Sequence, residues 1–121
     1  KPFTPINTLT ETQADEKWFN RLNEIIQENI SNTEFSVDQL TRSVNMSRTL
    51  LYAKVKAVTG LTPNEFIRLV RLRKAAEYLA GNEYKINEIC YMVGFNSPSY
   101  FAKCFQNQFG VLPKDFINNT N

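Results

Sequence analysis

The sequence predicts an all-α fold of about seven helices, in which two similar helical units are joined by one long central helix. Three observations support this prediction. Residues 35–67 resemble residues 84–117 at a nearly constant offset. Between the two copies, residues 62–79 carry apolar side chains at close to the helical period of 3.6 residues. Residue types that cap helices stand at the start of several expected helices, at Ser36, Ser47, Thr62 and Ser97.

The central helix is expected at residues 62–79 because the sequence marks both its start and its end. Thr62 can cap the first turn, and Glu65 can accept a hydrogen bond from the backbone of Thr62. Pro63 occupies the first helical position, where no N–H is needed. Gly81 stands just past the expected end. A helix of this length spans roughly 27 Å, so we expect it to hold the two units at a fixed distance.

The amino-terminal part is expected to contain an arm and two helices. Residues 1–14 have two prolines, four threonines and no sustained periodicity, which predicts a linker or arm. The domain proper is then residues 15–121. Its first helix begins near Asp15, with one apolar face formed by Trp18, Leu22, Ile25, Ile26 and Ile30. After a polar turn, Ser36 begins a short helix that ends near Ser43, with Gln39 at the reciprocal capping position.

Each copy of the repeat, residues 36–60 and 85–110, reads as a short helix, a tight turn and a longer helix. Asn45 and Gly94 occupy the same place in the two turns, and both residue types tolerate the left-handed backbone that a sharp turn requires. Thr41 and Cys90, four residues earlier, are small enough to let the two helices cross closely. A last helix is expected at residues 112–119.

The core positions of each longer helix indicate which side chains point outward. Leu51 and Val55 in the first copy, and Phe101 and Phe105 in the second, are expected in the core. The opposite face of the first copy's longer helix then presents Arg48, Thr49, Tyr52, Ala53 and Lys56. In the second copy the opposite face presents Pro98, Ser99, Ala102, Lys103 and Gln106, and the cap Ser97 is added to these candidates for contact.

Charge is segregated along the chain. Residues 1–41 hold three Lys/Arg and seven Asp/Glu, residues 42–74 hold eight and one, and residues 75–121 hold three and four. The basic block consists of Arg42, Arg48, Lys54, Lys56, Arg68, Arg71, Arg73 and Lys74. Such a block is the footprint expected of polyanion binding, although solvated helix faces would account for it equally well.

Several function classes lack their residues. The chain has no histidine, and Cys90 and Cys104 do not form a CxxC pair, so the usual zinc sites and histidine catalysis are excluded. With no nucleophile or paired-carboxylate motif, we expect no enzyme, catalytic residue, metal or cofactor. Two thiols do not make a disulfide framework, so a reducing compartment is the simpler assumption and we expect a cytoplasmic protein. No apolar run approaches about 18 residues, which predicts no membrane contact. The start at Lys1 suggests a fragment of a longer chain.

The short helix, tight turn and longer helix of each unit are typical of a helix-turn-helix motif. Residues 86–116, INEICYMVGFNSPSYFAKCFQNQFGVLPKDF, closely resemble the signature of the AraC/XylS family of bacterial transcription regulators, and the resemblance covers residues 36–117. The first half is most similar to the C-terminal output domains of Bacteroidetes hybrid two-component regulators, and the motifs that carry this resemblance are DEKWFNRL, FSVDQL, MSRTLLYAKVKAVTGLTPNEFI and RLRKAAEYL. Departures from the family pattern are Cys90 in place of Ala, Leu112 in place of a Thr/Ser cap, and Ile117 in place of Arg.

The resemblance implies sequence-specific binding of double-stranded DNA, with the second helix of each unit in a major groove. The family's base-reading positions correspond to Thr49, Tyr52 and Ala53, and to Ser99, Ala102 and Lys103. RNA polymerase and upstream receiver or sensor domains are the further partners that it implies. The alternative is a helical adaptor that binds protein through its aromatic second repeat.

The length of the central helix generates a testable prediction about the binding site. Two recognition helices on one rigid connector enter successive major grooves only if these lie about one turn, roughly 34 Å, apart on one side of the duplex. The operator should therefore be asymmetric and be covered by one chain. Inserting about 5 base pairs between the half-sites should abolish tight binding, because the second recognition helix then faces the wrong side of the duplex. Tight binding retained at the half-turn insertion would show that the connector is not rigid.

Overall fold

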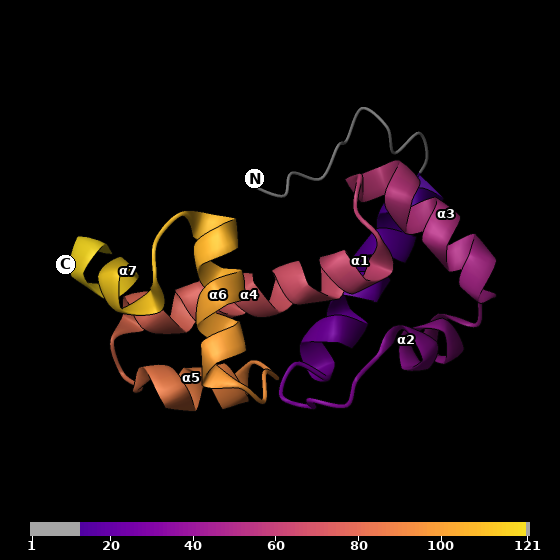
Figure 1. The fold of residues 1–121 in the computed structure, drawn as a ribbon. Coiled ribbons are helices and arrows are strands. Elements are labelled where there is room, and N and C mark those ends of the chain that lie inside the picture. The colour runs from indigo at the N-terminus through magenta and orange to yellow at the C-terminus, as the bar shows by residue number, and fades with distance from the viewer. Residues whose placement is uncertain (1–12, 121) are drawn as a thin grey trace. The chain divides into compact units, whose positions relative to one another are not determined.

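In the computed structural model the described residues, 13–120, form seven α-helices and no strand (Figure 1). Side chains are described for residues 14–117. The helices are α1 (Gln13–Glu28), α2 (Val37–Val44), α3 (Arg48–Thr59), α4 (Pro63–Gly81), α5 (Ile86–Met92), α6 (Pro98–Phe109) and α7 (Pro113–Thr120). The all-α prediction is confirmed, while the arm expected at residues 1–14 lies almost entirely outside the described residues. No described helix is long and apolar enough to cross a membrane.

The chain divides into two compact units. The first unit contains residues 35–70 and the described residues up to 29, and the second contains residues 30–34 and 71–120. The chain passes from the first unit to the second within α4, between Val70 and Arg71. Residues 30–34 precede α2 in sequence, yet they belong with the second unit, which the repeat pattern does not predict.

The first unit is built around apolar side chains from α1, α2, α3 and the first half of α4. Leu22, Leu40 and Leu51 are completely buried. The rings of Phe19 and Phe66 lie 5.5 Å apart, so that α1 and α4 meet through an aromatic contact. Leu51 and Val55 are buried as the sequence predicts, and this fixes which face of α3 points outward.

The second unit has a core rich in phenylalanine. Its ring centroids follow one another from Phe95 to Phe101 at 5.2 Å, from Phe101 to Phe105 at 5.9 Å, and from Phe105 to Phe116 at 5.4 Å. These tilted and edge-on pairs add directional stabilisation to the burial of apolar area. They join α6 to the α5–α6 turn on one side and to α7 on the other.

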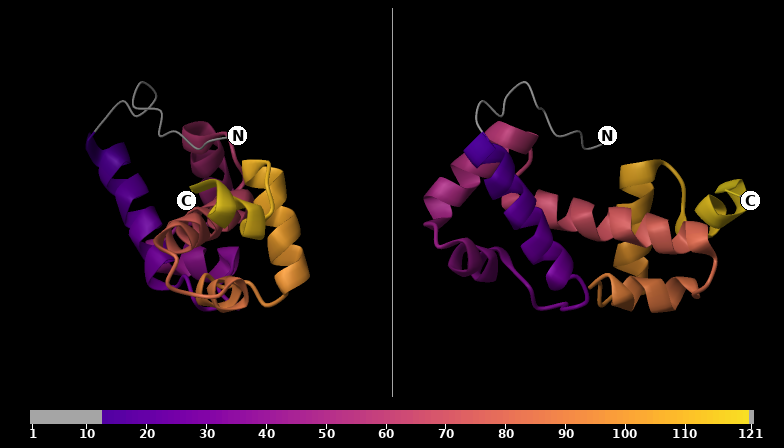
Figure 2. Two further views of the ribbon diagram at one scale, coloured as in Figure 1. Left: turned by 90° about the vertical axis from the view of Figure 1, so that its left-hand side faces the viewer. Right: turned by 180° about the vertical axis from the view of Figure 1, so that it is seen from behind.

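Both helix pairs turn as the sequence predicts (Figure 2). Asn45 has φ 54° and Gly94 has φ 95°, both in the left-handed region. The hydroxyl groups of Ser47 and Ser97 accept hydrogen bonds from Leu50 N (3.1 Å) and Tyr100 N (3.2 Å), and so cap α3 and α6. The capping residues therefore determine where the two longer helices begin.

The start of α4 is also confirmed. Thr62 N donates to Glu65 Oε1 at 2.9 Å, and Glu65 N donates to Thr62 Oγ1 at 3.2 Å. The backbone hydrogen bond from Thr62 lowers the pKa of Glu65. At the other end the prediction is wrong: Gly81 is the last residue of α4 rather than the residue after it. Asn82, with φ 56°, supplies the left-handed backbone that ends the helix.

Arg71 on α4 is buried, with 7% of its surface exposed. Its Nη1 donates to Ile30 O (2.6 Å) and Val93 O (2.8 Å), and its Nη2 donates to Asn32 O (3.0 Å). Burial lowers the pKa of Arg71, but a guanidinium stays protonated in a protein. The charge is stabilised by three backbone carbonyls, which bind residues 30–34 to the second unit.

The contact with Arg71 also explains the position of Ile30. The sequence places Ile30 on the apolar face of the first helix, but α1 ends at Glu28. Ile30 instead packs against the core of the second unit, and its carbonyl accepts from Arg71. The helical period alone extends the predicted helix to Ile30, because nothing local distinguishes Ile30 from the apolar residues before it.

Gly94 is required by the Arg71 contact as well as by its backbone conformation. A Cβ atom at Gly94 would lie 1.4 Å from Arg71 Nη1 and 2.3 Å from Ile30 O. We expect Gly94→Ala to lower the free energy of unfolding by about 3 kcal/mol or more, since it adds left-handed strain and displaces a buried hydrogen-bonded charge. Urea unfolding followed by circular dichroism measures the loss.

The matched control is Gly60→Ala. Gly60 also has a positive φ, 76°, but a Cβ atom there would meet nothing within 4 Å. Its substitution should therefore cost only the backbone strain, about 1 to 2 kcal/mol. Equal losses in the two variants would show that the Arg71 contact does not constrain Gly94.

Candidate nucleic-acid interface

The outward face of α3 gathers the five residues that the sequence nominates in the first repeat. Ser47 caps the helix, and Leu51, Val55 and Val58 bury the opposite face. The five nominated side chains are then exposed, except for the half-buried Tyr52, and are Arg48, Thr49, Tyr52, Ala53 and Lys56. A hydroxyl, a phenol, a guanidinium and an ammonium therefore stand within two turns of one helix. These groups can donate to phosphates and to base edges.

Arg48 is linked to both α2 and α3. Its Nη1 donates to Asp38 Oδ1 in the first turn of α2. Its guanidinium carbon also lies 5.7 Å from the centroid of the Tyr52 ring, within the range of a cation–π contact. The three side chains form a continuous series, which we call the Asp38–Arg48–Tyr52 chain.

Lys54 belongs to the basic block, but it is engaged by α1. Its Nζ lies 3.6 Å from Asp15 Oδ1 and 4.6 Å from the centroid of the Trp18 ring. Trp18 Nε1 in turn donates to Met46 Sδ at 3.1 Å, next to the α2–α3 turn. Lys54 therefore contributes to the packing of α1 on the helix pair, and its charge is partly neutralised.

The outward face of α6 is nearly neutral. Ser99, Lys103 and Gln106 are exposed, while Ser97 and Ala102 are half-buried. Ser97 has a structural task, since its hydroxyl accepts from Tyr100 N and lies 3.2 Å from Ser99 Oγ. Lys103 is the one cation among the five nominated residues of this helix.

The sequence reasoning missed an equivalent pair on the two longer helices. Leu50 is 54% exposed and Tyr100 is 51% exposed. They hold the same register position, because the repeat offset of 50 that pairs Ser47 with Ser97 also pairs Leu50 with Tyr100. Both sit directly beside the nominated residues, and large exposed apolar side chains can cover sugars and thymine methyl groups. The repeat alignment contained the signal for this pair.

The basic block is not one continuous surface. Arg71 does not belong to a polyanion-binding surface, contrary to what its place in the basic block predicts, because the structure buries it on three carbonyls. Lys74 is also engaged, with its Nζ 3.4 Å from Glu77 Oε1. Arg42 and Lys56 are exposed. The sequence of α4 does not reveal which of its cations is buried, because nothing local distinguishes Arg71 from the charged residues around it.

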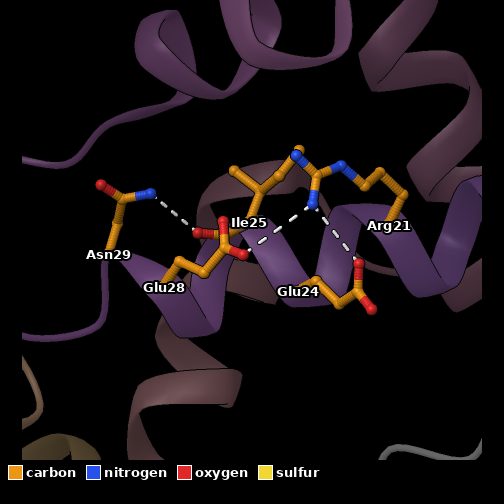
Figure 3. A network of polar contacts seen from close by, with 5 residues as sticks. All are labelled: Arg21, Glu24, Ile25, Glu28 and Asn29. Atoms are coloured by element: carbon orange, nitrogen blue, oxygen red, sulfur yellow. Dashed lines mark hydrogen bonds and ion pairs between the residues drawn. The ribbon is translucent and has the colours of Figure 1, made fainter.

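The exposed face of α1 carries its own ion pairs (Figure 3). Arg21 Nη1 lies 3.4 Å from Glu24 Oε1 and 3.9 Å from Glu28 Oε2. Asn29 Nδ2 donates to Ile25 O at 2.8 Å and closes the end of the helix. None of the residues nominated for DNA lies on α1, so this network offers a comparison for charge changes elsewhere in the first unit.

The cysteines have structural positions. Cys90 and Cys104 are both buried. Burial raises the pKa of the Cys90 thiol, and its Sγ lies 3.8 Å from Phe95 O across the α5–α6 turn. A buried, protonated thiol is unreactive. Among the described residues, no group of His, Cys, Asp and Glu is arranged to hold a metal ion.

The family model that matches the chain is a helix-turn-helix domain, over residues 40–119. A segment of "Histidine kinase P4" from Formosa agariphila is 41% identical over 98% of the chain, which spans 8% of that protein. The "HTH-type transcriptional regulator MtrA" of Neisseria gonorrhoeae is 34% identical over 79% of the chain, which covers 33% of the regulator. The chain thus spans a small part of these relatives.

Solved structures share the fold. The C-terminal domain of AraT, a response regulator from Geobacillus stearothermophilus, has a TM-score of 0.76, with 26% identity and 84% of each chain covered. A transcriptional regulator with an AraC-type DNA-binding domain from Chromobacterium violaceum has a TM-score of 0.81, with 22% identity, over 90% of this chain and 96% of that one. The DNA-binding domain of AdpA, solved with a target DNA, has a TM-score of 0.74 and 21% identity, over 89% and 93%.

Proposed function

The chain belongs to the helix-turn-helix family of AraC-type DNA-binding domains, and from this premise we propose that it binds double-stranded DNA sequence-specifically as the output domain of a transcription regulator. The observation that carries the proposal is the outward face of α3, where polar and cationic side chains gather on the second helix of a helix-turn-helix pair. The second helix of such a pair is the one that enters the major groove. The proposed role is binding, with no catalytic step.

The first unit is proposed to supply most of the base reading and of the phosphate contacts. Tyr52 offers its ring to a thymine methyl group and its hydroxyl to a base edge, and Thr49 offers a hydroxyl beside it. Lys56 and Arg42 are exposed cations on α3 and α2, suited to phosphates. Ala53 is the small position at which a base can approach the helix closely.

The second unit is proposed to add a less charged contact. Ser99, Lys103 and Gln106 are the exposed polar groups of α6, with Ala102 between them. Gln106 and Ser99 can bond base edges, and Lys103 can bind a phosphate or a guanine. Ser97 would act through its cap, which fixes the start of α6. The two units would thus read different base sequences.

The wider setting of the proposed regulator is a two-component system in the cytoplasm. The similarity to a segment that makes up a small part of a histidine kinase supports an output domain that receives its signal from sensor or receiver domains in a longer chain. RNA polymerase is the proposed partner through which DNA binding changes transcription.

Tyr52 gives the sharpest test of base reading. Tyr52→Ala should weaken binding to a cognate duplex by roughly 1 to 3 kcal/mol and relax preference at one base step, whereas Lys56→Ala should weaken all sequences alike. Titrations of fluorescent duplexes, cognate and random, measure both effects. Tyr84→Ala is the control, because Tyr84 is an exposed tyrosine that packs on Tyr78 and belongs to neither α3 nor α6. Equal losses on both duplexes for Tyr52→Ala would refute its reading role.

Salt dependence tests the share of phosphate neutralisation. Since Arg71 is buried and Arg48, Lys54 and Lys74 are engaged in ion pairs, we expect about four phosphate contacts, so affinity should fall on the order of a hundredfold between about 50 and about 200 mM salt. Lys56→Gln should flatten the slope by about one phosphate. A salt-independent affinity would contradict the proposed electrostatic contribution.

A further inference from the structure

The Asp38–Arg48–Tyr52 chain places a carboxylate on the proposed DNA-facing side of the first unit. Asp38 and Arg48 are 67% and 54% exposed in their side chains. Exposed ion pairs contribute little to stability, because water screens them and holding two long side chains costs entropy. A contribution to stability therefore does not explain the Asp38–Arg48 pair. Its position beside Tyr52 points to a role in binding.

A carboxylate at this place lowers affinity for any duplex. It neutralises Arg48, which would otherwise be available to a phosphate. The second repeat has no equivalent pair, since the positions that match Asp38 and Arg48 are the neutral Asn87 and Pro98. The pair is thus confined to the repeat that carries Tyr52, the side chain nominated for base reading.

The contacts of Arg48 indicate how a lower overall affinity can be accompanied by higher specificity. Arg48 donates to Asp38 with one nitrogen, and its guanidinium carbon lies 5.7 Å from the Tyr52 ring centroid. Arg48 is therefore in contact with both the Asp38 carboxylate and the Tyr52 ring. A guanidinium free of Asp38 could bind the backbone of any duplex, and a Tyr52 free of Arg48 could move away from its base.

We propose that Asp38 is a positioning residue for specificity: by holding Arg48 over Tyr52 it suppresses sequence-independent phosphate binding and orders the base-reading side chain. Specificity is a difference between two affinities, so weakening the non-specific one raises it. The inference rests on the proposed DNA-binding function and names a residue outside the recognition helix that tunes it. No contact of Asp38 with DNA is required.

The test compares wild-type protein with Asp38→Asn, on a cognate duplex selected from a randomised library and on a scrambled duplex of the same composition. We expect Asp38→Asn to bind the scrambled duplex about three- to tenfold more tightly and to have a salt slope steeper by about one phosphate. The cognate duplex should gain less, so the ratio of cognate to scrambled affinity should fall, by up to about tenfold. Asp38→Glu, which keeps the charge, should retain the wild-type ratio.

Two controls separate positioning from net charge. Glu24→Gln removes the same charge from another exposed arginine pair of the first unit, since Glu24 lies 3.4 Å from Arg21 on α1, and should leave the ratio unchanged. In an Arg48→Gln background, Asp38→Asn should no longer alter the ratio or the salt slope, because its effect acts through Arg48. Circular dichroism and thermal melting establish that each variant is folded.

The possible results point in different directions. If Asp38→Asn and Glu24→Gln shift both duplexes equally and leave the ratio intact, Asp38 acts only through net charge and the inference is overturned. The same holds if Asp38→Asn retains its effect without Arg48. If wild-type protein selects no duplex and binds none, the proposed function itself fails, whatever the variants do.

Discussion

One buried guanidinium organises the second unit. Arg71 enters from α4 and satisfies the carbonyls of Ile30, Asn32 and Val93, so residues 30–34 and the α5–α6 turn meet at one charge. Burying a charge is costly unless hydrogen bonds compensate it. The conformations of residues 30–34 and of the α5–α6 turn are therefore tied to the presence of Arg71, and Gly94 must be small for the same reason. The position of α6, and with it the outward face of the second unit, depends on this contact.

Much of the fold can be predicted from the sequence, because capping and turn residues act on the backbone next to them. Thr62 and Glu65 cap α4 reciprocally, and Asn45 and Gly94 turn the two helix pairs, as their residue types predict. The predictions that are wrong concern residues whose positions depend on partners far away in the sequence. Ile30 continues a helical pattern but packs against another core, and Asn82 rather than Gly81 takes the left-handed position, because α4 ends at Gly81 and not at the predicted residue 79.

The candidate site shows the same division. Helical geometry and the buried Leu51 and Val55 were sufficient to predict which face of α3 points outward. Charge counting was less informative, because a sequence does not show that Arg71 is buried or that Lys54 lies against Trp18. The Asp38–Arg48 pair also escaped notice, since the two residues are ten positions apart and meet only because the α2–α3 turn brings the helices together. Electrostatics of a surface must be read after the fold is known.

The assignment of residues 30–34 to the second unit constrains the order in which the chain can fold. The hydrogen bond between Arg71 and Ile30 joins residues 41 positions apart, and α2 and α3 lie in the loop that this contact closes. A contact of such sequence separation carries a loop-closure entropy that is smaller once the intervening residues are already compact. The first helix pair can thus form from nearby residues, whereas the second unit is completed only when a segment synthesised before that pair returns to it. Cutting the chain at the start of α4 would remove part of the second unit along with the first.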